Sequence, residues 1–159
     1  MTDASQPTKR ELSSAARYYA VQALFQMEAA GQTADRVTQE FNLYRIDADD
    51  RDGPTSEADH KMFARIVDDA VTWQSRIDQA TDRGLVARWP IDRIDPVLRA
   101  VFRAAGAELV AEKAPVKVVI TEYVRLAQAF FPDGKEPKFV NAVLDHVARD
   151  LRPDAFAAN

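Results

Sequence analysis

The side chains best suited to chemistry in this sequence are its two histidines, and their surroundings favour neither catalysis nor metal binding. His60 lies in the segment EADHK and His146 in LDHVA, each next to an acid. Adjacent residues on a helix point about 100° apart, so neither Asp–His pair is expected to share a ligand. Neither histidine has a second one at metal-binding spacing, and the sequence contains no cysteine. We therefore predict exposed or partly packed histidines, and a protein that is not an enzyme and uses no metal or other cofactor.

The sequence also gives little reason to expect a nucleotide-binding site or a catalytic pair of carboxylates. The five glycines form neither a GxGxxG nor a GxxxxGK loop, so a nucleotide-phosphate site is not expected. Glu108 and Glu122 lie near apolar stripes, and we predict that they are partly buried with an arginine partner rather than paired for catalysis. These exclusions favour a binding protein.

The remaining candidates are basic and aromatic residues at the predicted starts of the first and last helices. They are Lys9, Arg10, Arg17, Lys135, Lys138 and Phe139. Backbone N–H groups at a helix start favour phosphate, and an aromatic face lets an unpaired base stack. The pattern is compatible with an RNA-binding surface. On the pattern alone, however, the favoured interpretation of Phe139 is that it packs against the core.

The elements that position these residues all have helical periodicity, and no clear alternating strand pattern occurs. Asp95 followed by Pro96 is typical of a helix start, and Ser56 with Asp59 resembles a capping box. The sequence therefore predicts an all-α fold of about seven helices. The predicted helices span residues 12–30, 33–44, 56–81, 96–112, 116–130 and 137–152, with a short segment at 82–89.

A chain of 159 residues is one domain's worth. We predict a disordered leader at 1–11, a single helical domain at 12–152 and a tail at 153–159. The acidic segment around Asp-Gly-Pro cannot build a core, so the loop at 46–56 is expected to be mobile.

The net charge of −4 at first disfavours a nucleic-acid binder, but the acids are concentrated. Residues 46–59 contain six acids and one base; without them, the chain's 25 acids and 21 bases become 19 and 20. A locally basic surface is therefore compatible with the composition. No apolar run approaches membrane-spanning length, no signal peptide is evident, and the lack of cysteine suits a reducing compartment, so we expect a cytoplasmic protein.

Four segments, in this order and at these distances, resemble the NusB family of bacterial transcription antitermination factors. They are ARYYAVQALFQME, FRAAGAEL, PVKVVITEYVRLAQAF and KFVNAVLDHVA. The resemblance covers about residues 15–152, and the KFVN-x-VLD block is its most specific part. It implies an all-helical fold of two subdomains. It also implies pairing with NusE, a small ribosomal subunit protein, and binding of single-stranded boxA RNA, which helps RNA polymerase to read through terminators, notably in ribosomal RNA operons.

By this resemblance Arg17, Lys138 and Phe139 belong to the RNA-binding surface. The chain departs from the family pattern where KRELSSAAR replaces an arginine-rich start, and at Gly106 and Ala107, where a bulky residue and a tyrosine are common. The alternative function is a NusB-like protein-interaction module or homodimer with little RNA binding.

Overall fold

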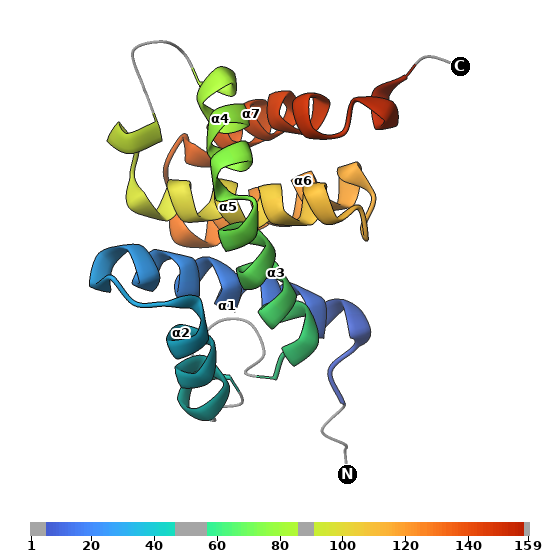
Figure 1. Cartoon of the computed structure of the whole chain (residues 1–159). Coiled ribbons are helices and arrows are strands. Elements are labelled where there is room, and N and C mark those ends of the chain that lie inside the picture. The colour runs from blue at the N-terminus through green and yellow to red at the C-terminus, as the bar shows by residue number, and fades with distance from the viewer. Residues whose placement is uncertain (1–5, 47–56, 86–90, 158–159) are drawn as a thin grey trace.

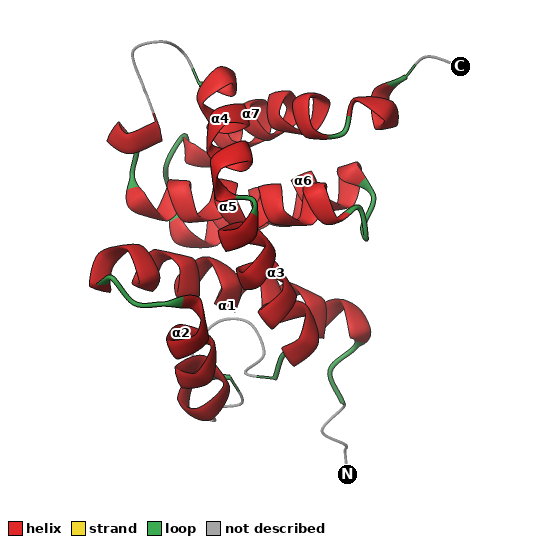
Figure 2. Cartoon of the chain, in the orientation of Figure 1, coloured by secondary structure: helices red, strands yellow, loops and turns green. Residues whose placement is uncertain are grey.

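The computed structural model describes residues 6–46, 57–85 and 91–157, and every regular element in these ranges is helical (Figure 2). The elements are α1 (Lys9–Ala30), α2 (Ala34–Glu40), η1 (Phe41–Arg45), α3 (His60–Thr72), α4 (Gln74–Gly84), η2 (Ile91–Arg93), α5 (Pro96–Ala111), α6 (Val116–Phe130), α7 (Glu136–Leu151) and η3 (Pro153–Phe156). Seven of these described elements are α-helices, so the predicted all-α class is confirmed.

Helix α1 begins at Lys9, three residues earlier than predicted, and therefore includes the end of the expected leader. The reason is a capping box: the Thr8 hydroxyl accepts from the Glu11 N–H, and the Glu11 carboxylate accepts from the Thr8 N–H. The helix ends at Gly31, whose φ of 67° is the left-handed conformation that favours glycine. Residues 1–5 of the leader lie outside the described residues.

The single helix expected over 56–81 is two helices in the structure, because the helical conformation is interrupted at Trp73, between α3 and α4. Asp59, not Ser56, caps α3 by accepting from the Met62 N–H, and Ser56 lies outside the described residues. The break leaves Trp73 42% exposed, although Trp73 continues the apolar helical spacing of Ile66 and Ala70. Of the expected acidic loop, Ile46 is described and is buried, so it belongs to the core; residues 47–56 lie outside the described range.

Helix α5 is the central element, in contact with α1, α3, α4, α6 and α7. Figure 1 shows it between α1 with α2 on one side and α4 with α7 on the other, which agrees with two subdomains sharing one core. Gly106 lets α5 approach α4 closely, because a Cβ there would overlap the side chain of Ile77. The departure from the family pattern at Gly106 is thus matched by Ile77.

The C-terminal helix α7 starts at Glu136 and ends at Leu151, close to the predicted bounds. The expected tail at 153–159 is not wholly irregular, since residues Pro153–Phe156 form the 3₁₀ turn η3. The Phe156 ring lies under the Arg149 guanidinium, 4.3 Å from it, which ties this turn back to α7.

Candidate nucleic-acid interface

The structure separates the six predicted site residues into two groups of three. Lys9, Arg10 and Arg17 lie on the first half of α1, whereas the others lie at the start of α7. Figure 1 shows that the chain enters these two helices at opposite ends of the molecule. Their contacts agree: Arg17 binds Glu108 near the end of α5, while Phe139 contacts Phe102 six residues earlier, about 9 Å along the axis.

Arg17 lies in the protein interior, with its side chain 7% exposed. Its Nε donates to Glu108 Oε2 at 2.7 Å, and its Nη1 lies 3.7 Å from Glu122 Oε1. Tyr123 also donates its hydroxyl to Glu108, at 2.6 Å. The arginine partner predicted for the two buried glutamates is therefore confirmed, and it is one of the residues expected to bind RNA.

In the low-dielectric interior, the attraction between the Arg17 guanidinium and the carboxylates of Glu108 and Glu122 is stronger than it would be in water. Burial lowers the pKa of Arg17, but the hydrogen bond and charge of Glu108 outweigh it, so the net shift is upward. Burial and the negative charge of Glu108 both raise the pKa of Tyr123 well above its ordinary value. The cluster therefore joins α1, α5 and α6 with Arg17 charged and Tyr123 neutral.

A hollow of about 610 Å³ lies beside this cluster, at the end of the molecule where α1 begins. Arg10, Ser13 and Lys117 line it together with one edge of Arg17 and of Glu122. Arg10 is exposed and lies 3.8 Å from Glu122, and Lys9 is exposed on the same helical turn. Phosphate approaching this end would meet Lys9 and Arg10, because the Arg17 charge is compensated by two carboxylates.

At the start of α7, a second hollow of about 330 Å³ has an apolar floor and a charged rim; we call it the α7 hollow. Its floor is formed by Ile94, Leu98 and Phe139, and its rim by Arg93, Asp95, Lys135 and Glu136. Lys138 is exposed on the same turn of α7. The α7 hollow thus brings Lys135 and Phe139 together and places Lys138 beside them.

Phe139 combines a packing contact with access to this hollow. Its ring is half-buried and meets Phe102 edge-on, with centroids 6.1 Å apart. The ring therefore rests on the core through Phe102 and lines the α7 hollow at the same time. The two interpretations of Phe139, packing and stacking, do not exclude each other.

A third hollow, of about 390 Å³, lies at the first turn of α5 and was not predicted from the sequence. Phe25 and Phe130 line it, and Phe25 is 38% exposed. Val97 borders this Phe25 hollow and Leu98 the α7 hollow. Successive residues of a helix point about 100° apart, so the two hollows flank the first turn of α5. The signal for it in the sequence is a second apolar face on α1, formed by Tyr18, Val21 and Phe25 at helical spacing.

Polar groups also line the Phe25 hollow. Gln22 contributes a buried amide oxygen without a hydrogen-bond partner among the described residues. Arg45 donates to Gln26 at 3.1 Å and lies 4.8 Å from the Phe41 ring centroid. The hollow therefore combines aromatic faces with a cation and the amide side chain of Gln22.

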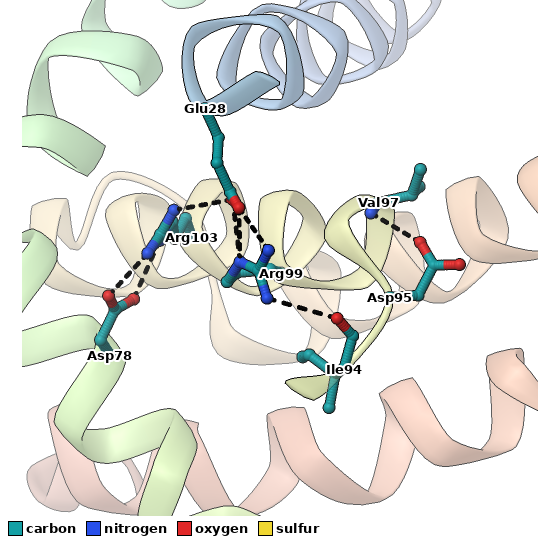
Figure 3. Close-up of polar contacts among 7 residues, drawn as sticks. All are labelled: Glu28, Asp78, Ile94, Asp95, Val97, Arg99 and Arg103. Carbon is teal, nitrogen blue, oxygen red and sulfur yellow. Dashed lines mark hydrogen bonds and ion pairs between the residues drawn. The ribbon is translucent and has the colours of Figure 1, made fainter. Parts of the chain in front are cut away.

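The first turn of α5, between the two hollows, is held from several sides (Figure 3). The Asp95 carboxylate accepts from the Val97 N–H at 2.7 Å and caps the helix. Arg99 donates through Nε to Glu28 at the end of α1, at 2.8 Å, and Arg103 pairs with Asp78 of α4 at 2.8 Å. The Arg99 and Arg103 bonds hold α5 to α1 and α4, and α5 contributes Val97 to one hollow and Leu98 to the other.

The arrangement favours recognition of an unpaired nucleic acid. Half-exposed rings can offer stacking faces, cations can attract phosphate, and amide and carboxylate groups can accept hydrogen bonds from base edges. His60 and His146 are both exposed, as predicted. Among the residues that the structure describes, no cluster of three metal-ligating side chains occurs and no helix is both long and apolar enough to cross a membrane.

Comparison with known proteins agrees with this description. Residues 14–149 match the model of the NusB family. The chain is 43% identical over 149 residues to the transcription antitermination protein NusB of Maricaulis maris, covering 93% of this chain and 92% of that protein. It is also 43% identical over 140 residues to that of Caulobacter vibrioides, covering 87% and 93%.

Two solved structures share the fold at 26% identity. The NusB of T. maritima superposes with a TM-score of 0.70 over 90% of this chain and 95% of that one. The antitermination factors NusB and NusE in complex with double-stranded RNA give 0.69 over 86% and 95%. Fold and relatives together define an all-helical, non-enzymatic factor of bacterial transcription. The chain belongs to the NusB family, and its function is transcription antitermination.

Proposed function

We propose that this chain carries out antitermination by binding single-stranded boxA RNA together with NusE in the cytoplasm, as part of a transcribing RNA polymerase complex. The observation that carries the proposal is the pair of aromatic hollows on either side of the first turn of α5, with Phe139 in one and Phe25 in the other. A related NusB and NusE have been seen in complex with RNA, which supports both partners.

The RNA in that related complex is double-stranded, but the hollows favour unpaired bases. A ring at the floor of a hollow stacks only on a base that has left its own stack. Lys135 and Lys138 are exposed beside Phe139 and would hold the backbone of such a strand. Lys9 and Arg10, at the opposite end, would contact a second stretch of RNA.

Arg17 has a different place in this proposal. Its buried guanidinium is committed to Glu108, so its main contribution would be to hold α1 against α5. A direct RNA contact by Arg17 stays a prediction, limited to the edge that lines the hollow next to Arg10.

Substitutions of Phe139 and Lys138 test the proposal by fluorescence anisotropy on labelled boxA RNA. Phe139→Ala should weaken binding by about 1–3 kcal/mol, and Phe139→Tyr should stay close to wild type. Because the ring is only half-buried, Phe139→Ala should cost less than the roughly 3–5 kcal/mol typical of a buried phenylalanine. A variant that unfolds early yet binds boxA normally when folded would assign Phe139 to the core alone.

Lys138→Ala should lower affinity for boxA and for a scrambled strand alike, and flatten the salt slope by roughly 0.7. Lys61→Ala is the matched control, because Lys61 is an exposed lysine on α3. The alternative function, a protein-interaction module or homodimer, predicts a shallow salt slope and no preference for boxA. If the wild-type protein shows a shallow salt slope and no preference for boxA, both with and without NusE, the result would favour that alternative.

A further inference from the structure

Glu136 lines the α7 hollow, and one of its two carboxylate oxygens has no hydrogen-bond partner among the described groups. Its Oε1 atom is buried and accepts no hydrogen bond from any described group. A buried acceptor without a partner is costly, and more so when it carries charge. The start of α7 favours a negative charge in its first turn, but that field does not supply the missing hydrogen bond.

Gly134 holds this carboxylate in place by leaving room for it. A Cβ on Gly134 would overlap Oε1 of Glu136. Among the described glycines only Gly31 has a positive φ, so the backbone at Gly134 does not itself require glycine. The missing side chain therefore leaves Oε1 of Glu136 packed against the loop, while other atoms of Glu136 line the α7 hollow.

A carboxylate is a poor neighbour for an RNA backbone, because it repels phosphate. It is an acceptor only, so it pairs with N–H and O–H groups. Arg93 and Lys135 on the same rim supply the positive charge for the backbone. A single RNA strand offers this carboxylate two kinds of donor: the ribose 2′-OH, and the N–H groups on the edge of a base that lies over Phe139. Only the second kind differs from one base to another.

We propose that Glu136 selects the base that stacks on Phe139, by accepting a hydrogen bond from its exocyclic amino group. This inference rests on the RNA-binding function proposed above. Cytosine, adenine and guanine carry such an amino group. Uracil does not, and the two carbonyl oxygens beside its N3–H repel a carboxylate. The α7 hollow is therefore a specificity site that rejects uracil.

Cytidine and uridine 12-mers test this proposal, since each places one type of base in the hollow whatever the register of the strand. Their bases are of equal size and differ at C4 and N3. By fluorescence anisotropy at low salt, the wild-type chain should bind the cytidine 12-mer about tenfold more tightly, the ratio expected for one good hydrogen-bond discrimination.

Two substitutions should remove this ratio by different routes. Glu136→Gln can donate to the uracil O4, so both strands should bind within about twofold of each other. Gly134→Ala keeps the charge but displaces the flexible end of the Glu136 side chain, and should reduce the ratio in the same way. Asp133→Asn is the control: it removes one charge from an exposed position of the same loop and should strengthen both complexes equally.

Circular dichroism should show unchanged folding in all three variants, because the substituted positions lie in or next to an exposed loop. A wild-type ratio near one would overturn the inference while leaving RNA binding intact. So would a ratio that survives both Glu136→Gln and Gly134→Ala. If the wild-type chain bound neither strand, the proposed RNA-binding function itself would fail.

Discussion

Replacing Arg17 with methionine should destabilise the protein far more than a surface substitution would. The change leaves Glu108 buried, charged and without its guanidinium partner, with only the Tyr123 hydroxyl donating to it. Removing one partner of a buried pair costs about 3–5 kcal/mol. A domain of this size has roughly 5–15 kcal/mol of stability in total, so the variant should fold but sit near its limit.

Urea unfolding followed by circular dichroism measures this loss. With a slope of about 2 kcal/mol per molar urea, a loss of 4 kcal/mol lowers the midpoint by about 2 M. The double variant Arg17→Met with Glu108→Gln removes both charges and keeps an acceptor for Tyr123. It should regain most of the loss, with a coupling energy of about 2–3 kcal/mol.

The same pair of variants separates a structural role from an RNA contact. If Arg17 acts only by holding α1 to α5, the stable double variant should bind boxA RNA nearly as tightly as the wild type. A midpoint for Arg17→Met within about 0.5 M of wild type would refute the argument from burial. Weak RNA binding by a fully stable double variant would instead show that Arg17 contacts RNA.

Three further predictions concern the fold that carries the site. Because the pKa of Tyr123 is raised in the folded protein, the unfolded chain loses the Tyr123 hydroxyl proton at a lower pH than the folded one does. The stability that depends on this hydroxyl is therefore fully present below about pH 10 and falls above it. Tyr123→Phe should lack this alkaline loss of stability when urea midpoints are compared between pH 8.5 and 11. The pKa of Glu28 is lowered chiefly by its hydrogen bond from Arg99, so the stability that this pair contributes is present above the ordinary glutamate pKa and is lost as the pH falls through the folded value. Glu28→Gln should therefore lose less stability than the wild type on acidification, as measured by urea midpoints. An unchanged dependence on acid pH would contradict the pairing in Figure 3. Gly106→Ala should cost about 1–3 kcal/mol because the new methyl group overlaps Ile77, although alanine favours a helix; a higher melting temperature would show that α4 and α5 move apart freely.

Local signals in the sequence were sufficient for most helix boundaries. Asp95 and Pro96 start α5 as predicted, because a cap depends only on residues within one turn. The capping box of Thr8 and Glu11 has the same local origin, because it depends only on a threonine followed three residues later by a glutamate. The break at Trp73 is different, since the apolar period continues through it and predicts one helix.

The sequence by itself determined the helical class, the exposure of both histidines and the need of Glu108 for an arginine. It also placed Phe139 and two lysines together, because they are neighbours in the chain. Only the tertiary structure decided that Arg17 is that partner, since the two residues are 91 positions apart. It likewise brought Phe25 of α1 next to the start of α5, forming a hollow that no single segment encodes. Helix caps and apolar periodicity depend on residues close together in the chain, so they could be predicted from the sequence. Burial and surface hollows arise where helices distant in the chain meet, so they could not be predicted from it.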